Sequence, residues 1–305
     1  MLHIRTPLIL HPGLSTPQRR IWLKLENLQP SGSFKLRGMG LLCTQALQQG
    51  KHKVVCPSGG NAGLATAVAA VALGLEACIV VPHTTPQATR ERITGTGAKL
   101  IVHGKVWDES NQLALELAQD ADTEYVPAFD HPVLWQGHST MIDEVLEDCP
   151  QVDTIVTSVG GGGLLAGILT GLQRHGRSDC RIIACETAGA ASFAAALKAG
   201  HPVKLPQINT VASSLGALQV AAWPLQQIQG FPYQSVVLSD AEAVMGVVRY
   251  ADDLRQLVEP ACGVSLAVAY LDHPAIAAAH DVVMVVCGGV SISAQKVAEW
   301  ALSAQ

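Results

Sequence analysis

The sequence predicts an α/β protein in which two mostly parallel sheets are covered by helices. Short apolar segments alternate with Ala- and Leu-rich helical segments, the apolar segments are continuous rather than alternating, and glycine-rich turns follow two of them. Continuous apolar strands are typical of a sheet buried on both faces. With 305 residues, 49% of them hydrophobic and 15% charged, the chain can bury a large core. Two runs of such units, before and after about residue 135, indicate two lobes.

Strands are expected where short runs of Val, Ile, Leu, Ala and Cys stand between turn signals. These runs cover residues 53–56, 77–81, 99–102, 154–157, 181–185 and 282–286. Helices are expected between them, at residues 63–73 and 87–94. A capping box, in which Ser239 stands three residues before Glu242, predicts a helix that continues to Tyr250. We expect this capping box to be purely structural.

Composition and charge exclude several classes of function. The net charge is −5 and no basic run interleaves with aromatic residues, so nucleic-acid binding has no support. No segment predicts a membrane span, and residues 1–7 do not predict a signal peptide. The 8 cysteines form no C-x-x-C pair and the 11 histidines no H-x-x-x-H pattern. This favours free thiols, a cytoplasmic location and the absence of a zinc site.

Lys35 is the strongest candidate for a reactive residue. It stands between Phe34 and Leu36, after the turn-forming segment 30–33 (PSGS). Burial in such a neighbourhood disfavours the ammonium form and leaves a nucleophilic amine that can form a Schiff base with a carbonyl cofactor. The alternative is a solvated surface lysine.

Two glycine-rich segments each follow an expected strand and open an expected helix. In residues 58–63 (SGGNAG), small residues let a ligand approach the backbone, and amides at the start of a helix attract an anion such as a carboxylate. A tight structural turn is the alternative. In residues 160–163, four consecutive glycines expose several amides and predict a phosphate cradle. This segment lacks the Lys-Ser/Thr of a P-loop, and a dinucleotide-binding loop is its alternative.

Cys287 follows the expected strand 282–286 and precedes Gly288 and Gly289. A thiol at the carboxyl end of a central strand faces the ligand crevice in doubly wound sheets. A buried core cysteine is the alternative.

Together these segments resemble the fold-type II pyridoxal-phosphate enzymes, and most closely the short animal-type enzymes among the L-serine/L-threonine dehydratases. The resemblance covers nearly the whole chain, and it includes residues 30–40, 58–63, 84–92, 158–167, 186–193, 258–263 and 285–289. It implies a two-domain fold like that of tryptophan synthase β, each domain an open, mostly parallel sheet covered by helices. The large cofactor-binding domain would comprise residues 1–34 and 134–305, and the small substrate-binding domain residues 35–133.

The resemblance also implies an activity and individual roles. A homodimeric lyase with pyridoxal 5'-phosphate would eliminate water and ammonia from L-serine, giving pyruvate, and from L-threonine, giving 2-oxobutanoate. Lys35 would form the Schiff base and act as the base, Phe34 would pack near the cofactor ring, and Asn61 would hydrogen-bond the 3-oxygen. Cys287 would face the pyridine nitrogen, where a neutral thiol favours β-elimination over transamination.

Three larger sets of residues are implied in the same way. The cofactor phosphate would be held by the backbone amides of Gly160, Gly161, Gly162, Gly163 and Leu164. The substrate carboxylate would be held by Ser58, Gly59, Gly60, Asn61 and Ala62. A monovalent cation, expected to be K+, would lie near Glu186 and the carbonyls of Gly160, Ala190, Leu215 and Ala217.

The sequence departs from related patterns at two positions. Racemases of this fold carry a serine where this chain has Gly59, so we expect weak racemisation and a slightly enlarged pocket. The divalent-metal subfamily has an aspartate at the position of Ser192, and its absence is the reason for expecting a monovalent cation.

Three other functions stay open from the sequence. The first is another pyridoxal-phosphate-dependent β-lyase of the same fold. The second, from a different class, is a dinucleotide-binding oxidoreductase. The third is a catalytically silent protein that keeps the cofactor pocket. No appended regulatory domain is expected after Cys287.

Overall fold

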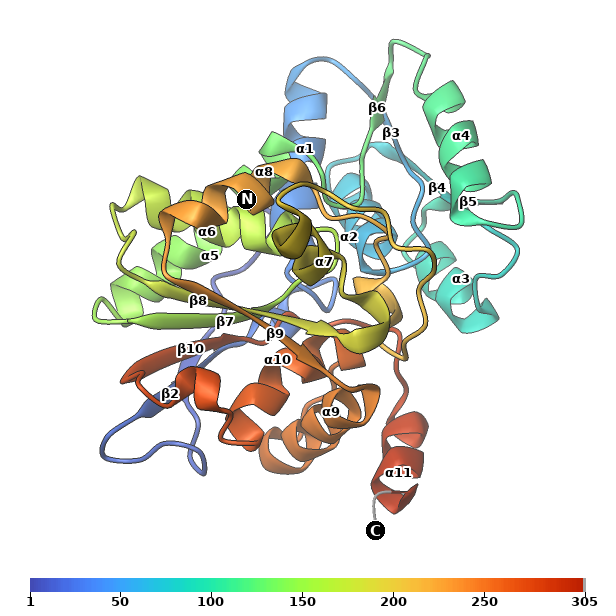
Figure 1. Ribbon diagram of the computed structural model, residues 1–305. Helices are drawn as coiled ribbons and strands as arrows, with labels where there is room; N and C mark the ends of the chain where they lie inside the picture. Colours follow the sequence, from blue (N-terminus) through green and yellow to red (C-terminus); the bar gives the residue numbers. More distant parts are fainter. Residues whose placement is uncertain (304–305) are drawn as a thin grey trace. The chain divides into compact units, whose positions relative to one another are not determined.

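The computed structural model describes residues 1–303 and divides into two compact units. One unit comprises residues 1–4 and 29–138, and the other comprises residues 5–28 and those from 139 onward. Each unit is built on its own sheet, and Figure 1 labels the elements along the chain. The prediction of an α/β fold with two mostly parallel sheets is therefore confirmed.

The smaller unit holds a four-stranded parallel sheet in the order β5-β4-β3-β6. Its strands are β3 (Lys53–Cys56), β4 (Glu76–Val81), β5 (Lys99–Val102) and β6 (Thr123–Tyr125). Its helices are α1 (Lys35–Gln48), α2 (Asn61–Ala72), α3 (Gln87–Thr94) and α4 (Trp107–Leu117). The helix α5 (Pro132–Asp148) contributes residues to both units.

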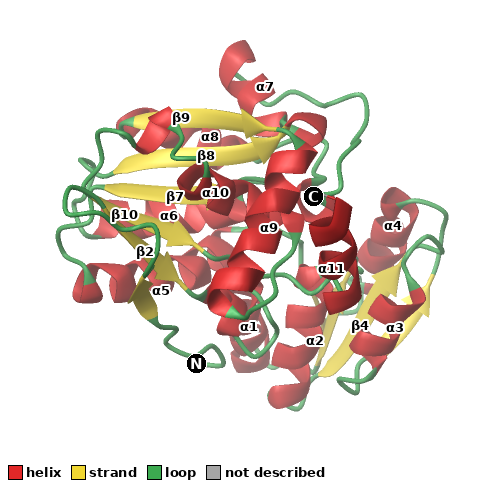
Figure 2. Ribbon diagram, turned by 90° about the horizontal axis from the view of Figure 1, so that it is seen from below, coloured by secondary structure: helices red, strands yellow, loops and turns green. Residues whose placement is uncertain are grey.

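The larger unit holds a six-stranded sheet in the order β1-β2-β10-β7-β8-β9, drawn as yellow arrows in Figure 2. Only β1 pairs antiparallel. The strands are β1 (Leu8–Leu10), β2 (Arg20–Lys24), β7 (Thr154–Ser158), β8 (Arg181–Thr187), β9 (Tyr233–Leu238) and β10 (Asp281–Val285). Every residue of β7 and β10 is buried, as expected for strands covered on both faces.

Six helices belong to the larger unit: α6 (Gly163–Arg174), α7 (Ser192–Ala199), α8 (Ala222–Gln227), α9 (Asp240–Leu254), α10 (Pro260–Tyr270) and α11 (Ala294–Ser303). The predicted capping box opens α9, because the Ser239 hydroxyl accepts from the Glu242 amide at 3.2 Å and the Glu242 carboxylate accepts from the Ser239 amide at 2.7 Å. Glycines let α9 and α10 cross closely, since a Cβ on Gly246 would lie 2.2 Å from the Gly263 oxygen.

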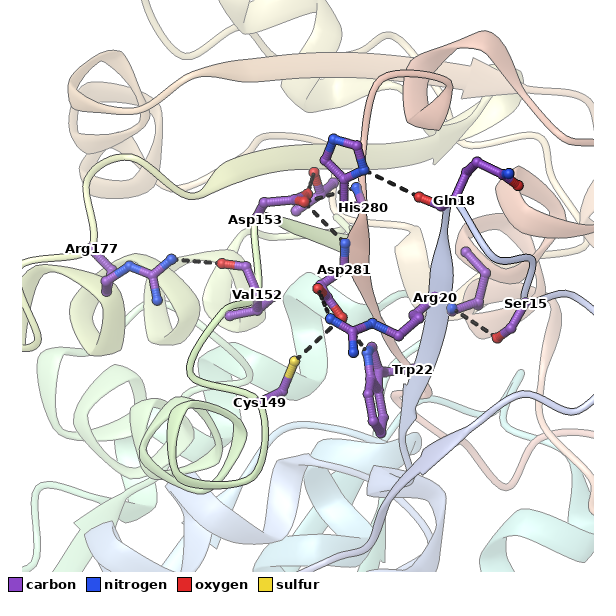
Figure 3. Close-up of polar contacts among 12 residues, drawn as sticks. Ser15, Gln18, Arg20, Trp22, Cys149, Val152, Asp153, Arg177, His280 and Asp281 are labelled. Carbon is purple, nitrogen blue, oxygen red and sulfur yellow. Dashed lines mark hydrogen bonds and ion pairs between the residues drawn. The ribbon is translucent and has the colours of Figure 1, made fainter.

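Two carboxylates tie the amino ends of β2, β7 and β10 together (Figure 3). Buried Asp281 accepts a hydrogen bond from Trp22 Nε1 at 2.9 Å and pairs with the Arg20 guanidinium. Asp153 Oδ2 accepts from the backbone amides of His280 and Asp281, at 2.8 and 3.0 Å. Neighbouring strands therefore start in a fixed register at this end of the sheet.

Four strands were not expected from the sequence: β1, β2, β6 and β9. In β2 the apolar Ile21 and Leu23 alternate with Arg20, Trp22 and Lys24, so the strand is not a continuous apolar run. Lys24 is nevertheless fully buried, because its ammonium group pairs with Glu144. A charge that is paired inside the fold cannot be recognised from local sequence.

The cysteines agree with the expectation of free thiols. All eight cysteines are free, and burial raises the pKa of several of them, including that of Cys56 to about 12. Among residues 1–303, no helix has both the length and the apolar character needed to cross a membrane.

Candidate functional site

Lys35 begins helix α1 and is held at its tip by the backbone. Its Nζ donates a hydrogen bond to the Ala128 carbonyl oxygen at 2.5 Å and lies 5.2 Å from the centroid of the Phe34 ring. The side chain is half-buried, while the next residues along α1, Leu36 and Arg37, are fully buried. The amine is therefore partly desolvated, as the neighbouring residues predict.

His138 packs against Phe34 and the start of α1. This contact was not predicted from the sequence. Its ring meets the Phe34 ring edge-on, with centroids 4.9 Å apart. The imidazole fits against α1 at Gly38, where a Cβ would lie 2.5 Å from His138 Cε1. Neither ring nitrogen has a hydrogen-bond partner among the described residues. Burial, and then the charges of Lys35 and Arg37, hold the pKa of His138 well below its usual value, so the ring is neutral.

The segment 58–62 forms the turn from β3 into α2, as the sequence predicts. The Gly60 amide donates to Ser58 Oγ at 3.3 Å, and α2 begins at Asn61. Glycine is required at position 63, because a Cβ there would lie 1.8 Å from the Ser58 carbonyl oxygen. Small residues thus close the turn that leads into α2, whose N-terminus is the kind of position that suits an anion.

The glycine segment 160–163 connects β7 to α6 in the larger unit. Gly162 has a positive φ of 93°, and a Cβ there would lie 2.9 Å from Pro224 Cγ. A Cβ on Gly160 would lie 3.0 Å from Leu215 Cα, and the Gly161 carbonyl accepts from the Ala221 amide at 3.0 Å. The outer side of the loop is packed against residues 215–224, and its amides open the N-terminus of α6. This is a backbone cradle suited to a phosphate.

Cys287 follows the end of β10, at the carboxyl end of the larger sheet, and is 6% exposed. A hydrogen bond with the Cys262 thiol, followed by burial, raises the pKa of Cys287 well above its usual value. The thiol is therefore neutral, and it can offer a weak hydrogen bond without carrying charge.

Glu186, at the end of β8, is fully buried and accepts hydrogen bonds from the backbone amides of Phe193 and Ala194, at 2.7 and 2.8 Å. Burial raises its pKa to about 7, and these two hydrogen bonds partly offset that rise. Ala190 lies in the turn just before α7, and the Leu215 carbonyl, which lies near Gly160, accepts from the Ala217 amide at 2.7 Å. Among residues 1–303, no three His, Cys, Asp or Glu side chains form a group that could hold a metal.

The structure gathers the predicted residues at the same type of position in each unit. In the smaller unit they lie at the starts of α1 and α2. In the larger unit they lie at the start of α6 and after β8 and β10. Except for the start of α1, which follows a loop, these positions are the carboxyl ends of parallel strands or the N-termini of the helices that follow, where ligands bind in open α/β sheets.

Comparison with known proteins assigns the family. A family model described as pyridoxal-phosphate dependent enzyme matches residues 1–288. The chain belongs to the family of pyridoxal-phosphate-dependent enzymes. It is 45% identical to the human protein named serine dehydratase-like, over 96% of this chain and 92% of the relative. It is 44% identical to human L-serine dehydratase/L-threonine deaminase, with coverage of 96% and 92%.

Solved structures agree with this family assignment. The chain matches a fungal L-serine ammonia-lyase from Rhizomucor miehei with a TM-score of 0.92 and 37% identity, over 100% of this chain and 99% of that chain. Threonine deaminase isoform 2 from Solanum lycopersicum matches with a TM-score of 0.88 and 28% identity, over 99% and 83%. The predicted resemblance and the two-domain fold-type II architecture are confirmed. The dinucleotide-binding alternative is not supported.

Proposed function

We propose that this pyridoxal-phosphate-dependent enzyme is an L-serine/L-threonine ammonia-lyase. It converts L-serine to pyruvate and ammonia, and L-threonine to 2-oxobutanoate and ammonia. The observation that carries the proposal is the placement of Lys35, a half-buried amine at the start of α1, in a chain 44% identical to an L-serine dehydratase/L-threonine deaminase.

The residues present fit pyridoxal phosphate. The cradle at 160–163 has no side chains, and a Cβ on Gly160 or Gly162 would collide with its surroundings, so only backbone amides face a bound phosphate. In the proposal, Lys35 binds the cofactor covalently and Phe34 packs near its ring. Asn61 would hydrogen-bond the 3-oxygen of the ring and Cys287 would face the pyridine nitrogen. The phosphate would be held by the amides of Gly160, Gly161, Gly162, Gly163 and Leu164. When bound, the cofactor supplies an electron sink for the Cα carbanion of the amino acid.

The amino group of the substrate would take the place of Lys35 on the cofactor, and the Lys35 amine released in this way would be the base that removes the Cα proton of the substrate. As a free base, an amine at this position can take up a proton and later release it, as a general base and acid must. The same nitrogen can then deliver a proton to the departing β-hydroxyl group, so that water leaves. The remaining aminoacrylate hydrolyses to the keto acid and ammonia, and this step takes up one water.

The segment Ser58 to Ala62 is the proposed binding site for the substrate carboxylate. The N-terminus of α2 favours an anion, and the Ser58 hydroxyl lies in the same turn. Orientation by the carboxylate would fix the Cα proton relative to Lys35. A neutral Cys287 thiol beside the pyridine nitrogen favours elimination, because it does not hold a proton there as a carboxylate would.

A monovalent cation, proposed to be K+, is held near Glu186 and the carbonyls of Gly160, Ala190, Leu215 and Ala217. The close approach of Gly160 to Leu215 and the buried Glu186 carboxylate support this site. Activity measured in KCl, NaCl and LiCl at equal ionic strength tests it. We expect the highest activity in KCl; equal activity in all three salts would contradict the proposed site.

The proposal also includes a homodimer that works in the cytoplasm. Eight free cysteines support a reducing compartment. Light scattering coupled to gel filtration tests the dimer, for which we expect twice the chain mass of 32.0 kDa.

The activity is tested by assaying pyruvate from L-serine and 2-oxobutanoate from L-threonine with the purified protein and added pyridoxal phosphate. D-serine and sulfur amino acids serve as comparison substrates. Turnover of the sulfur amino acids alone would point to another β-lyase of the same fold and would contradict the proposed substrate class.

A further inference from the structure

The space beside Gly59 is already filled by the side chain of Thr85. A Cβ built on Gly59 would lie 2.9 Å from Thr85 Cγ2, 3.0 Å from Thr85 Oγ1 and 3.4 Å from Val81 Cγ1. Two of these contacts are closer than side chains in folded proteins normally tolerate. The absence of a side chain at position 59 therefore does not open additional pocket volume, contrary to the expectation from the sequence.

Backbone geometry does not explain the glycine at this position. Gly59 is not among the residues with a positive φ, so its backbone would accept an L-amino acid. At Gly60, the next residue, a Cβ would meet only Ser58 Oγ, at 4.0 Å. Steric contact therefore disfavours a side chain at position 59, and the two atoms closest to the Cβ position belong to Thr85.

Thr85 is held in place by its own backbone. It follows β4 in the turn after the fully buried Val81, and its amide donates to the Pro82 carbonyl at 3.0 Å. Pro86 comes next and restricts the backbone of Thr85 before α3 begins. The side chain can turn about χ1, but its methyl and hydroxyl groups are almost equally far from the Cβ position of residue 59. A β-branched side chain at position 85 thus blocks that position by its shape.

We propose that Thr85 is a specificity-determining residue that takes the place of the side chain missing at Gly59. This inference rests on the proposed function, in which residues 58–62 hold the substrate carboxylate. The β-carbon of an amino acid is two bonds from its carboxylate carbon, so a side chain that presses on this turn also limits the space around the β-carbon. Serine and threonine differ by one methyl group on that carbon. Thr85 therefore sets the preference between them.

The steric part is tested by thermal unfolding, which needs no turnover. The variants are Gly59→Ala, Thr85→Ser, Thr85→Val and the two double variants that combine Gly59→Ala with each change at Thr85. We expect Gly59→Ala to lower Tm. In the double variants, Thr85→Ser should restore most of this loss of Tm, and Thr85→Val should restore none of it. Serine can turn its single γ-atom away, whereas valine keeps both. Strictly additive Tm changes in both double variants would overturn the contact.

The specificity part is tested by the ratio of kcat/KM for L-threonine to that for L-serine. One methyl group in a pocket is worth about 10-fold or more in such a ratio. We expect Thr85→Ser to raise the ratio about 10-fold, because it removes a methyl group from the wall of the proposed substrate pocket. Thr85→Val keeps the branched shape and removes no methyl group, so it should leave the ratio within about 2-fold of the wild type.

The two measurements separate the possible failures. If the Tm changes are coupled but the ratio is the same in both Thr85 variants, Thr85 only packs against Gly59 and the specificity role is wrong. If the wild-type enzyme turns over neither amino acid, the proposed function fails and the specificity role fails with it. The thermal measurements would then still decide whether Thr85 and Gly59 are in contact.

Discussion

Lys35 Nζ and the Ala128 carbonyl oxygen are joined by a hydrogen bond of 2.5 Å. Ala128 lies in the segment between β6 and α5, so the tip of the lysine side chain is fixed by backbone from the same unit. A carbonyl acceptor can hold either the neutral amine or the ammonium ion, because both carry N–H donors. The contact therefore positions the amine without committing it to one protonation state.

Replacing Lys35 with alanine should reduce turnover of L-serine by at least about 1000-fold, because the proposed base and the covalent attachment are both lost. The assay is pyruvate release at saturating pyridoxal phosphate. Lys53→Ala is the matched control, since Lys53 lies in the same unit and pairs with Asp120 in a partly exposed ion pair. Comparable activity in Lys35→Ala and in the control would contradict the role of Lys35.

Gly162→Ala should weaken pyridoxal phosphate binding by at least about 10-fold. Alanine at a positive φ costs about 1 kcal/mol of strain, and its Cβ would also collide with Pro224. Binding is measured by titrating the apoenzyme and following the absorbance of the cofactor. Gly176→Ala is the control, because Gly176 has a similar positive φ of 66° but nothing within 4 Å of its Cβ position. An equal loss of cofactor affinity in both variants would argue against a phosphate cradle at Gly162.

His138 should make the folded state less stable in mild acid. Its folded pKa lies well below the usual value, whereas in the unfolded chain it is about 6.5. Below pH 6.5 His138 binds a proton in the unfolded state but not in the folded state. It therefore lowers the free energy of unfolding by about 1.4 kcal/mol for each unit by which the pH falls. Urea unfolding at pH 5.0, 6.0 and 7.5 should show a shallower pH dependence for His138→Gln. Identical slopes for both proteins would mean that His138 titrates normally in the fold.

Asp281→Ala should lower the free energy of unfolding by about 2 kcal/mol or more. The change removes the acceptor of the Trp22 indole and leaves Arg20 without its carboxylate. The substrate specificity and KM should not change, because Asp281 lies at the opposite ends of the strands from the candidate site. Asp272→Ala removes an exposed partner of Arg19 and should cost less than about 1 kcal/mol. Equal stability losses in the two variants would contradict the structural role of Asp281.

The fold could be predicted well where local pattern and burial agree. The predicted strand 53–56 and the predicted helix 87–94 match β3 and α3 to the residue. The helix that begins at the capping box was also found, although it continues past Tyr250 to Leu254. In these segments the apolar period or the capping signal lies within the segment itself.

The supporting contacts of the candidate site could not be predicted. His138 reaches Phe34 across about one hundred residues of sequence, and Thr85 reaches Gly59 from the end of a neighbouring strand. Neither pair has a local pattern, because each contact exists only after the helices and strands have packed. The glycine motifs were visible because each follows a strand directly, and the lysine motif because Lys35 follows the turn-forming segment 30–33. The functional roles assigned to these motifs stay predictions.

The most direct test of the account is borohydride reduction of the enzyme with pyridoxal phosphate, followed by mass spectrometry of its peptides. A parallel sample is assayed for pyruvate from L-serine. The account predicts that the cofactor mass is fixed on Lys35 and that reduction abolishes pyruvate formation. Label on a different lysine, or full activity after complete labelling of Lys35, would contradict it.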